Sequence, residues 1–519
     1  MKKLNIKLLA SALLILGACS QDVIDLQAPE TTTPETTTPS KGNADFTKFV
    51  SIGNSLTAGF QAGALFTEGQ QNSLPLILSK QFSLAQGTTL AFNQPDINSV
   101  NGYYTVVGGK VLGRLILFDA DGTGPKTPAP APAGTTGMPA PYTGGDVPTA
   151  FTGDKTKLNN FAVPGILLGQ ALIPDTGNPA SPYYNGLWAR FASQPGVKSI
   201  LQDAIAAQPS FFLFDLGNND ILGYATGGGS NPAIFTSEAN FQGQYNSAIT
   251  ALLTANPNAK GVIANIPDVT TIPFFTTVAW NAIALDAATS STLTTNLANN
   301  YNAFLDGMIA AKYISAEEGA KRKLSYKAGA NGILLSDETL TDLTPYMNAS
   351  ANTQPLIPYA RARQATATDL ITLSAGSILG TAVPGTGGTA VYGVSYPVGD
   401  QYVLIPTETA EVKARTTAFN NIIKNAADGS NGRLALADVN ATFTALVNAR
   451  AGVYNGVTIT PNFAPPTGAF SEDGVHPNSR GYAFMANIFI DAINAKFSAN
   501  VPKASIADYK GTGLPVSAQ

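Results

Sequence analysis

The stretch "FVSIGNSLTAGF" (residues 49–60) joins a short apolar run to a glycine, two polar residues and then a helical pattern. An apolar run without polar alternation is typical of a strand that is covered on both faces. Gly53-Asn54-Ser55 follows as a turn, which places Ser55 at the start of a helix. A serine there is often only an N-cap, although its backbone N–H also lies where negative charge is stabilised. The stretch therefore predicts a buried strand, a turn and a helix, with a polar residue at the carboxyl end of the strand.

Four similar apolar runs follow, at residues 158–165, 210–217, 260–267 and 432–439. Helical patterns accompany them, and we assign these to residues 197–208, 293–309, 408–427 and 479–497. Strands that alternate with helices predict a three-layer α/β/α sandwich. We expect a five-stranded parallel, flavodoxin-like sheet at its centre. The apolar stripe of the last helix is interpreted as core packing.

Two segments do not fit a compact sandwich. Residues 119–157 form a long loop rich in proline, glycine and alanine, and its "DADG" (119–122) is a poor match to a calcium loop. Residues 270–430, between the fourth and fifth runs, combine helices with a Gly/Thr/Pro-rich stretch. We interpret this second segment as a partly helical insertion within a domain that spans residues 46–519.

The N-terminus predicts export and a lipid anchor. Residues 1–18 have a basic start and an apolar run too short to span a bilayer, as in a signal peptide. "LGAC" (16–19) resembles a bacterial lipobox, which implies that Cys19, the only cysteine, becomes the lipidated first residue. The alternative is a small residue within a signal peptide. Residues 19–45 repeat "PETTT" and read as an extended tether. We expect a cell-envelope protein on the outer membrane, because no aspartate follows Cys19 directly.

Charge argues against one class of partner. Lysine and arginine number 30 and aspartate and glutamate 34, giving a net charge of −4, and no basic block occurs. Nucleic acid is therefore not an expected partner, and the membrane is expected only through the lipid anchor.

Polar residues stand at the ends of the other predicted strands as well. Gly165 ends the second run, and Asn219 follows the third within "GNND" (217–220). After the fifth run comes "EDGVHPN" (472–478), where His476 is the only histidine of the chain and Asp473 is near enough to bond its ring. Each residue taken alone also has a structural interpretation, since glycine, asparagine and aspartate are common turn formers. Their joint position at the carboxyl ends of parallel strands is where ligands bind in open α/β sheets.

In this order the blocks "IGNSLTAG", "FAVPG", "GNND" and "DGVHPN" resemble those of the SGNH (GDSL-type) hydrolase family. The resemblance covers about residues 46–270 and 430–500. It implies that Ser55 is the nucleophile, His476 the general base and Asp473 the group that orients the imidazole. It also implies an oxyanion hole made by the backbone N–H groups of Ser55 and Gly165 and the side-chain amide of Asn219. One departure is Asn54, where the family usually has aspartate.

The resemblance implies a serine esterase or acylhydrolase that cleaves lipid acyl or acetyl esters through an acyl-enzyme, without a cofactor. Because one histidine and a lipidated cysteine leave only oxygen ligands, no metal site is expected. Two alternatives stay open. One is a carbohydrate esterase that deacetylates glycans, with the insertion as a sugar platform. The other is a non-catalytic surface lipoprotein that binds glycans or proteins on a hydrolase scaffold.

Overall fold

The computed structural model describes residues 38–103, 105–107, 110–119, 127–130, 145–514 and 516–517. The predicted signal peptide, Cys19, most of the predicted tether and most of "DADG" lie outside these residues. Near the start of the described residues, Ser40 pairs with Asn500, and Ala44 is buried. No helix in these ranges is long and apolar enough to cross a membrane.

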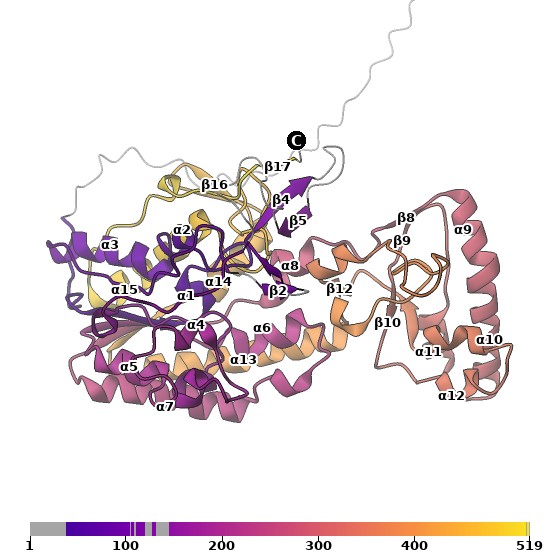
Figure 1. Ribbon diagram of the computed structural model, residues 1–519, viewed down its shortest axis with the longest axis horizontal. Helices are drawn as coiled ribbons and strands as arrows, with labels where there is room; N and C mark the ends of the chain where they lie inside the picture. Colours follow the sequence, from indigo (N-terminus) through magenta and orange to yellow (C-terminus); the bar gives the residue numbers. More distant parts are fainter. Residues whose placement is uncertain are drawn as a thin grey trace, which may run out of the picture. The chain divides into compact units, whose positions relative to one another are not determined.

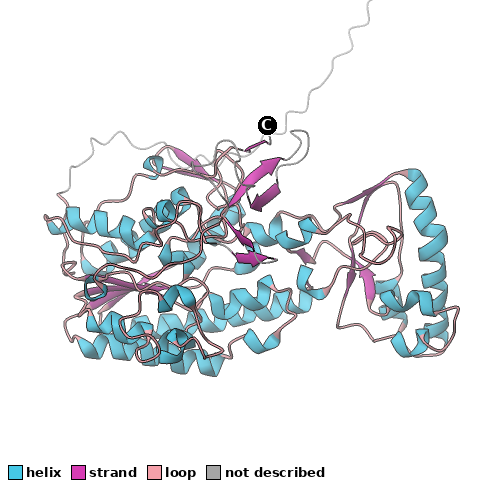
Figure 2. Ribbon diagram, viewed as in Figure 1, coloured by secondary structure: helices cyan, strands magenta, loops and turns pink. Residues whose placement is uncertain are grey.

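A parallel sheet of four strands lies at the centre of the fold (Figure 2). Its strands, in spatial order, are β1 (Phe49–Gly53), β6 (Phe211–Asp215), β7 (Lys260–Ala264) and β14 (Leu434–Ala437). Phe49 pairs with Phe211 and continues in register to Gly53 opposite Asp215. Four of the five predicted strands are thus confirmed, and their bounds differ from the expected ones by at most three residues.

The sheet has four strands rather than five, because residues 158–165 do not form a strand. They run beside β1 and make one parallel bridge to it, between Ser51 and Asn160. The side chain of Asn159 donates to the Phe49 carbonyl (2.8 Å), a role that a backbone N–H fills in a regular ladder. Pro164 has no N–H to donate, and Gly165 has a φ of +74°, which ends the extended conformation. The run therefore lies along the edge of the sheet as an irregular segment.

Helices cover both faces of the sheet (Figure 1). Phe211 of β6 packs against Phe82 of α3 (Leu74–Gln86) and Phe497 of α15 (Ser479–Phe497). Phe214, three residues on and so on the opposite face, packs against Tyr245 of α7 (Glu238–Ala255). The second face is also covered by α5 (Ile200–Ala206) and α13 (Pro406–Asp428).

The segment between β7 and α13 has hydrophobic clusters of its own, built around Tyr301 and Leu334 in one case and Ile333 and Val398 in the other. Its strands form three antiparallel pairs. Its helices are α8 (Pro273–Thr276), α9 (Ala287–Leu293), a π-helical turn (Thr294–Ala298), α10 (Asn299–Ala310), α11 (Ala316–Arg322) and α12 (Thr344–Met347). Its strands are β8 (Ile283–Leu285), β9 (Gly329–Asn331), β10 (Leu334–Ser336), β11 (Ala362–Gln364), β12 (Leu370–Ile371) and β13 (Val403–Leu404).

Short elements complete the described fold. The helices are α1 (Ser55–Ala58), α2 (Thr67–Gln70), α4 (Gly186–Ala189), α6 (Asn219–Thr226) and α14 (Val439–Ala449). The strands are β2 (Thr105–Val107), β3 (Lys110–Leu112), β4 (Leu115–Asp119), β5 (Thr127–Pro130), β15 (Gly452–Tyr454), β16 (Val457–Ile459) and β17 (Val516–Ser517). The predicted loop 119–157 thus contributes β5, which pairs with β4.

Candidate active site

Ser55 is the first residue of α1, directly after the carboxyl end of β1, and only 5% of it is exposed. Asn54 is the N-cap, because its Oδ1 accepts from the Leu56 N–H at 2.9 Å. Asparagine at this position therefore makes the turn hydrogen bond that an aspartate could also make. Its Nδ2 is buried and has no acceptor among the described residues. The backbone N–H of Ser55 also has no acceptor in the described part of the chain.

His476 connects two of the predicted site residues. Its Nε2 lies 2.8 Å from Ser55 Oγ, and its Nδ1 lies 2.8 Å from Asp473 Oδ2. Ser55 and His476 are 421 residues apart in sequence. Ser55 follows β1, whereas His476 lies in the loop before α15, beyond α14, β15 and β16. Phe60 packs against the imidazole, with ring centroids 4.8 Å apart. If Nδ1 carries the proton, Nε2 is free to accept the proton of the serine hydroxyl.

Asp473 is held by several donors as well as by the imidazole. Its Oδ1 accepts from the N–H groups of Val475 and His476, both at 2.8 Å, and its Oδ2 accepts from the Gly63 N–H at 2.7 Å. Burial raises the pKa of Asp473, but the charge and hydrogen bonds of His476 and the Val475 N–H lower it further. Its pKa therefore lies below the usual value. The carboxylate is both fixed in orientation and kept ionised.

Gly165 and Asn219 are brought to the same edge of the sheet. The Asn219 side-chain amide donates to the carbonyl of Ile166, the residue after Gly165, at 2.9 Å. Asp220 accepts from the Leu168 N–H at 2.9 Å, so two consecutive residues of the "GNND" block hold the Gly165 loop. The Gly165 N–H has no acceptor among the described residues, and the space beside its Cα is open.

Buried Asp215, at the end of β6, connects the serine block to the asparagine block. It accepts from Thr57 Oγ1 at 3.2 Å and from Asn218 Nδ2 at 3.0 Å. Burial raises the pKa of Asp215 to about 6, although both hydrogen bonds lower it. The carboxyl therefore links α1 to the start of α6, where Asn219 lies, and sequence reasoning did not single it out.

An apolar pocket with a volume of about 840 Å³, its open mouth included, adjoins Ser55 and His476. Its polar side chains are those of Asn54, Ser55, Asn218, Asn219 and His476. The rest of the lining is apolar or glycine: Leu56, Leu222, Pro267, Val269, Ile272, Val439, Phe443, Leu446, Ala469, Phe470, Val475, Pro477, Gly481, Phe484, Met485 and Ile488. A serine–imidazole–carboxylate chain, with a buried serine and a half-buried imidazole and carboxylate, thus adjoins a largely apolar cavity.

No protein-family model matches the chain, and no curated protein matches it. Among solved structures, the chain is similar to a protein from Parabacteroides merdae ATCC 43184 named a "putative GDSL-like lipase". The identity is 10%, the TM-score is 0.32, and the match covers 88% of this chain and 99% of the other.

Sequence reasoning missed the helix that lines one side of the pocket. Val439, Phe443 and Leu446 of α14 recur at steps of four and three residues, which is a helical pattern that could have identified it. The interpretation of the last helix as core packing is confirmed, because its apolar stripe belongs to the main hydrophobic core, and Met485 of that stripe also lines the pocket.

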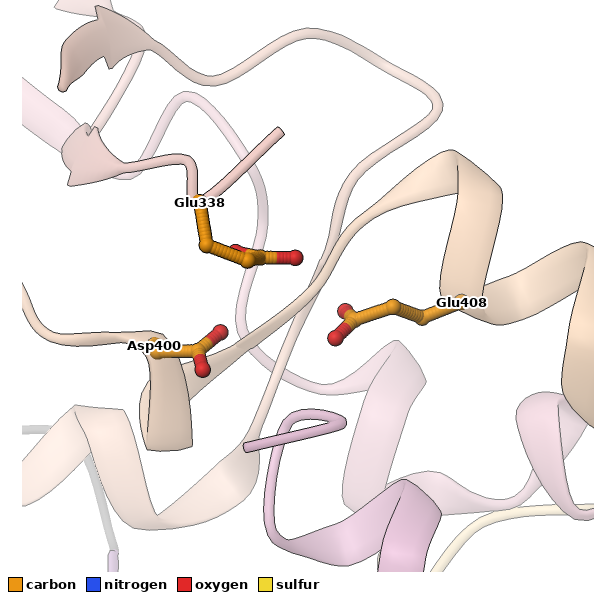
Figure 3. A group of neighbouring side chains, drawn as sticks. All are labelled: Glu338, Asp400 and Glu408. Carbon is orange, nitrogen blue, oxygen red and sulfur yellow. The ribbon is translucent and has the colours of Figure 1, made fainter. Parts of the chain in front are cut away.

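A second group of carboxyl side chains, the acidic cluster of Glu338, Asp400 and Glu408, was not predicted either (Figure 3). One oxygen from each lies within 4.8 Å of the others. Burial, followed by the charges of its neighbours, raises the pKa of Asp400 to about 7. Burial and the charges of Glu338 and Asp400 raise the pKa of Glu408 to about 8, against the effect of a hydrogen bond from the Ile405 N–H. Asp400 and Glu408 therefore bind protons near neutral pH.

Proposed function

We propose that this chain is a serine hydrolase that cleaves carboxylic esters through an acyl-enzyme. The observation that supports this most directly is the chain of two 2.8 Å contacts from Ser55 Oγ through His476 to Asp473. A serine hydroxyl is a weak nucleophile until a base within hydrogen-bond reach accepts its proton. His476 is the only imidazole in the sequence, so no second histidine competes for this role.

In the proposed reaction Ser55 Oγ attacks the ester carbonyl carbon, and its proton passes to His476 Nε2. The tetrahedral intermediate collapses when the bond to the alcohol oxygen breaks, and Nε2 gives the proton to that oxygen. Water then attacks the acyl-enzyme by the same route and releases the acid. The unpaired N–H groups of Ser55 and Gly165, with the Asn219 amide, are proposed to hold the oxyanion. Each such donor contributes about 3–4 kcal/mol to lowering the barrier.

Fluorophosphonate labelling tests the proposal, because the reagent reacts with an activated serine. We expect the wild-type protein to be labelled and Ser55→Ala to remain unlabelled. We expect His476→Ala to lose at least ~10³-fold in kcat for p-nitrophenyl butyrate while its thermal unfolding is little changed. Hydrolysis by His476→Ala near the wild-type rate would refute the mechanism.

We further propose that Cys19 is lipidated and anchors the protein to the cell envelope, on the outer membrane. The support for this is the sequence pattern of residues 1–19. The predicted tether of residues 19–45 would then hold the hydrolase away from the bilayer.

A further inference from the structure

The pocket beside Ser55 extends along two helices. Val439, Phe443 and Leu446 line it from successive turns of α14, and Gly481 and Ile488 mark the span that α15 lines. Each set spans seven residues, and at a rise of 1.5 Å per residue this corresponds to about 10 Å. The lining therefore extends about 10 Å along each helix, and Ser55 and His476 also belong to it.

The polar side chains of the lining come from the segments directly after β1 and β6 and from His476 before α15, where the proposed chemistry takes place. The rest of the lining is apolar or glycine, and much of it belongs to α14 and α15. Phe443, Phe484 and Met485 of these helices are each less than a tenth exposed. A sugar would lose its hydrogen bonds to water between these helices without replacement. A hydrocarbon chain would only gain from leaving water.

We infer that the channel between α14 and α15 binds a linear aliphatic acyl chain of about eight carbons, so that the substrates are medium-chain fatty acyl esters. The inference rests on the proposed function. Carbon–carbon bonds near 1.5 Å advance an extended chain by about 1.3 Å per carbon, so a length of about 10 Å holds roughly eight carbons. The chain is assigned to the acyl part of the ester because the acyl group stays attached to Ser55 Oγ through both halves of the reaction. The alcohol leaves after the first half.

A series of p-nitrophenyl esters from acetate to myristate, each below its micellar concentration, tests the inference. Burial of one methylene contributes roughly fourfold when it is complete. We therefore expect kcat/KM to rise at least tenfold from acetate to octanoate and to fall beyond decanoate. A profile that is flat or highest on acetate would overturn the inference. So would a preference for octyl acetate over ethyl octanoate, since that would put the chain on the alcohol side, or a preference for acetylated xylan.

Variants at the far end of the channel make the test specific. Leu446→Trp and Ile488→Trp should each shift the optimum toward butyrate and lower the ratio of octanoate to butyrate hydrolysis at least tenfold. Ile488 is only partly buried, so its variant is expected to fold even if Leu446→Trp does not. Ala445→Trp introduces the same side chain at an exposed position of α14 and should leave the ratio within about twofold. An unchanged ratio in a folded Ile488→Trp protein would contradict the inference.

Labelling by a small fluorophosphonate separates the two possible failures. A labelled Ser55 with no chain-length preference overturns the acyl channel and leaves the serine hydrolase intact. A wild-type protein that is neither labelled nor active on any ester overturns the proposed function, and the acyl channel with it.

Discussion

Replacement of Asp473 by asparagine tests how the imidazole is oriented. Asp473 Oδ1 accepts two backbone N–H groups, and this arrangement can persist in the variant. The new amide nitrogen must then occupy the position of Oδ2, which faces His476 Nδ1 and the Gly63 N–H. Because an amide nitrogen only donates, His476 has to accept at Nδ1 and carry its proton on Nε2. A protonated Nε2 cannot accept the proton of Ser55 Oγ.

Two losses of known size follow from this geometry. In serine proteases the wrong tautomer of an otherwise intact triad lowers kcat by about 10⁴-fold, and we expect ~10³–10⁴-fold here. The Gly63 N–H, which is buried, loses its acceptor and meets a second donor, which costs about 1–3 kcal/mol in the free energy of unfolding. Asp473→Asn should therefore be both slower and less stable than the wild type.

The measurements are kcat for p-nitrophenyl butyrate at pH 7 to 9 and unfolding in urea. Asp491→Asn is a matched control, because Asp491 pairs with Lys503 on the surface of α15 and is more than half exposed. The control should change the free energy of unfolding by less than about 1 kcal/mol and leave kcat unaltered. If Asp473→Asn kept kcat within tenfold of the wild type, the orienting role of the carboxylate would be refuted.

Two further predictions concern the acidic cluster and the N-terminus. Glu408 has a pKa of about 8 in the folded protein, far above its ordinary value of about 4.5, so its contribution to stability is complete below pH 4.5 and is lost as the pH rises to about 8. At pH 8.5 the free energy of unfolding of Glu408→Gln should therefore exceed that of the wild type by about 1–2 kcal/mol, a figure reduced for screening by solvent, and its melting temperature should be higher. At pH 4.5 the two proteins should melt at the same temperature. Equal melting temperatures at both pH values would contradict the raised pKa of Glu408. Cys19→Ser, expressed in a bacterium fed an alkyne-tagged palmitate, should carry no label and leave the membrane fraction, whereas a labelled variant would place the lipid on another residue.

Much of the proposed site could be predicted from sequence because its residues follow strands in a parallel sheet. The apolar runs before Ser55 and Asn219 each form a strand, and strands of one sheet end at one edge. The positions of Ser55 and Asn219 at one edge of the sheet therefore follow from topology. β14 is at the opposite end of the sheet from β1, and His476 lies beyond α14, β15 and β16, so the 2.8 Å contact between Ser55 and His476 is a finding of the structure.

The run at residues 158–165 shows where this reasoning fails. Its apolar residues resemble those of the true strands, and Phe161 and Val163 are buried as a strand would require. The difference lies in Asn159, whose side chain competes for the backbone groups of β1. A hydrophobic pattern indicates which residues are buried, but it does not indicate whether backbone or side-chain donors make the hydrogen bonds to the neighbouring strand.

The last helix explains why the pocket could not be predicted at all. In α15, Phe489 and Ile493 are fully buried against protein, and Met485, one turn earlier on the same stripe, is buried to a similar degree while it lines the cavity. All three satisfy the same helical period, because the pattern records exclusion from water and not the identity of the neighbour. Whether a position on the stripe faces protein or a void is decided by α14 and by the loop that carries Phe470. An apolar stripe therefore predicts where water is excluded, and only the packing of distant segments determines whether a ligand can take the place of protein there.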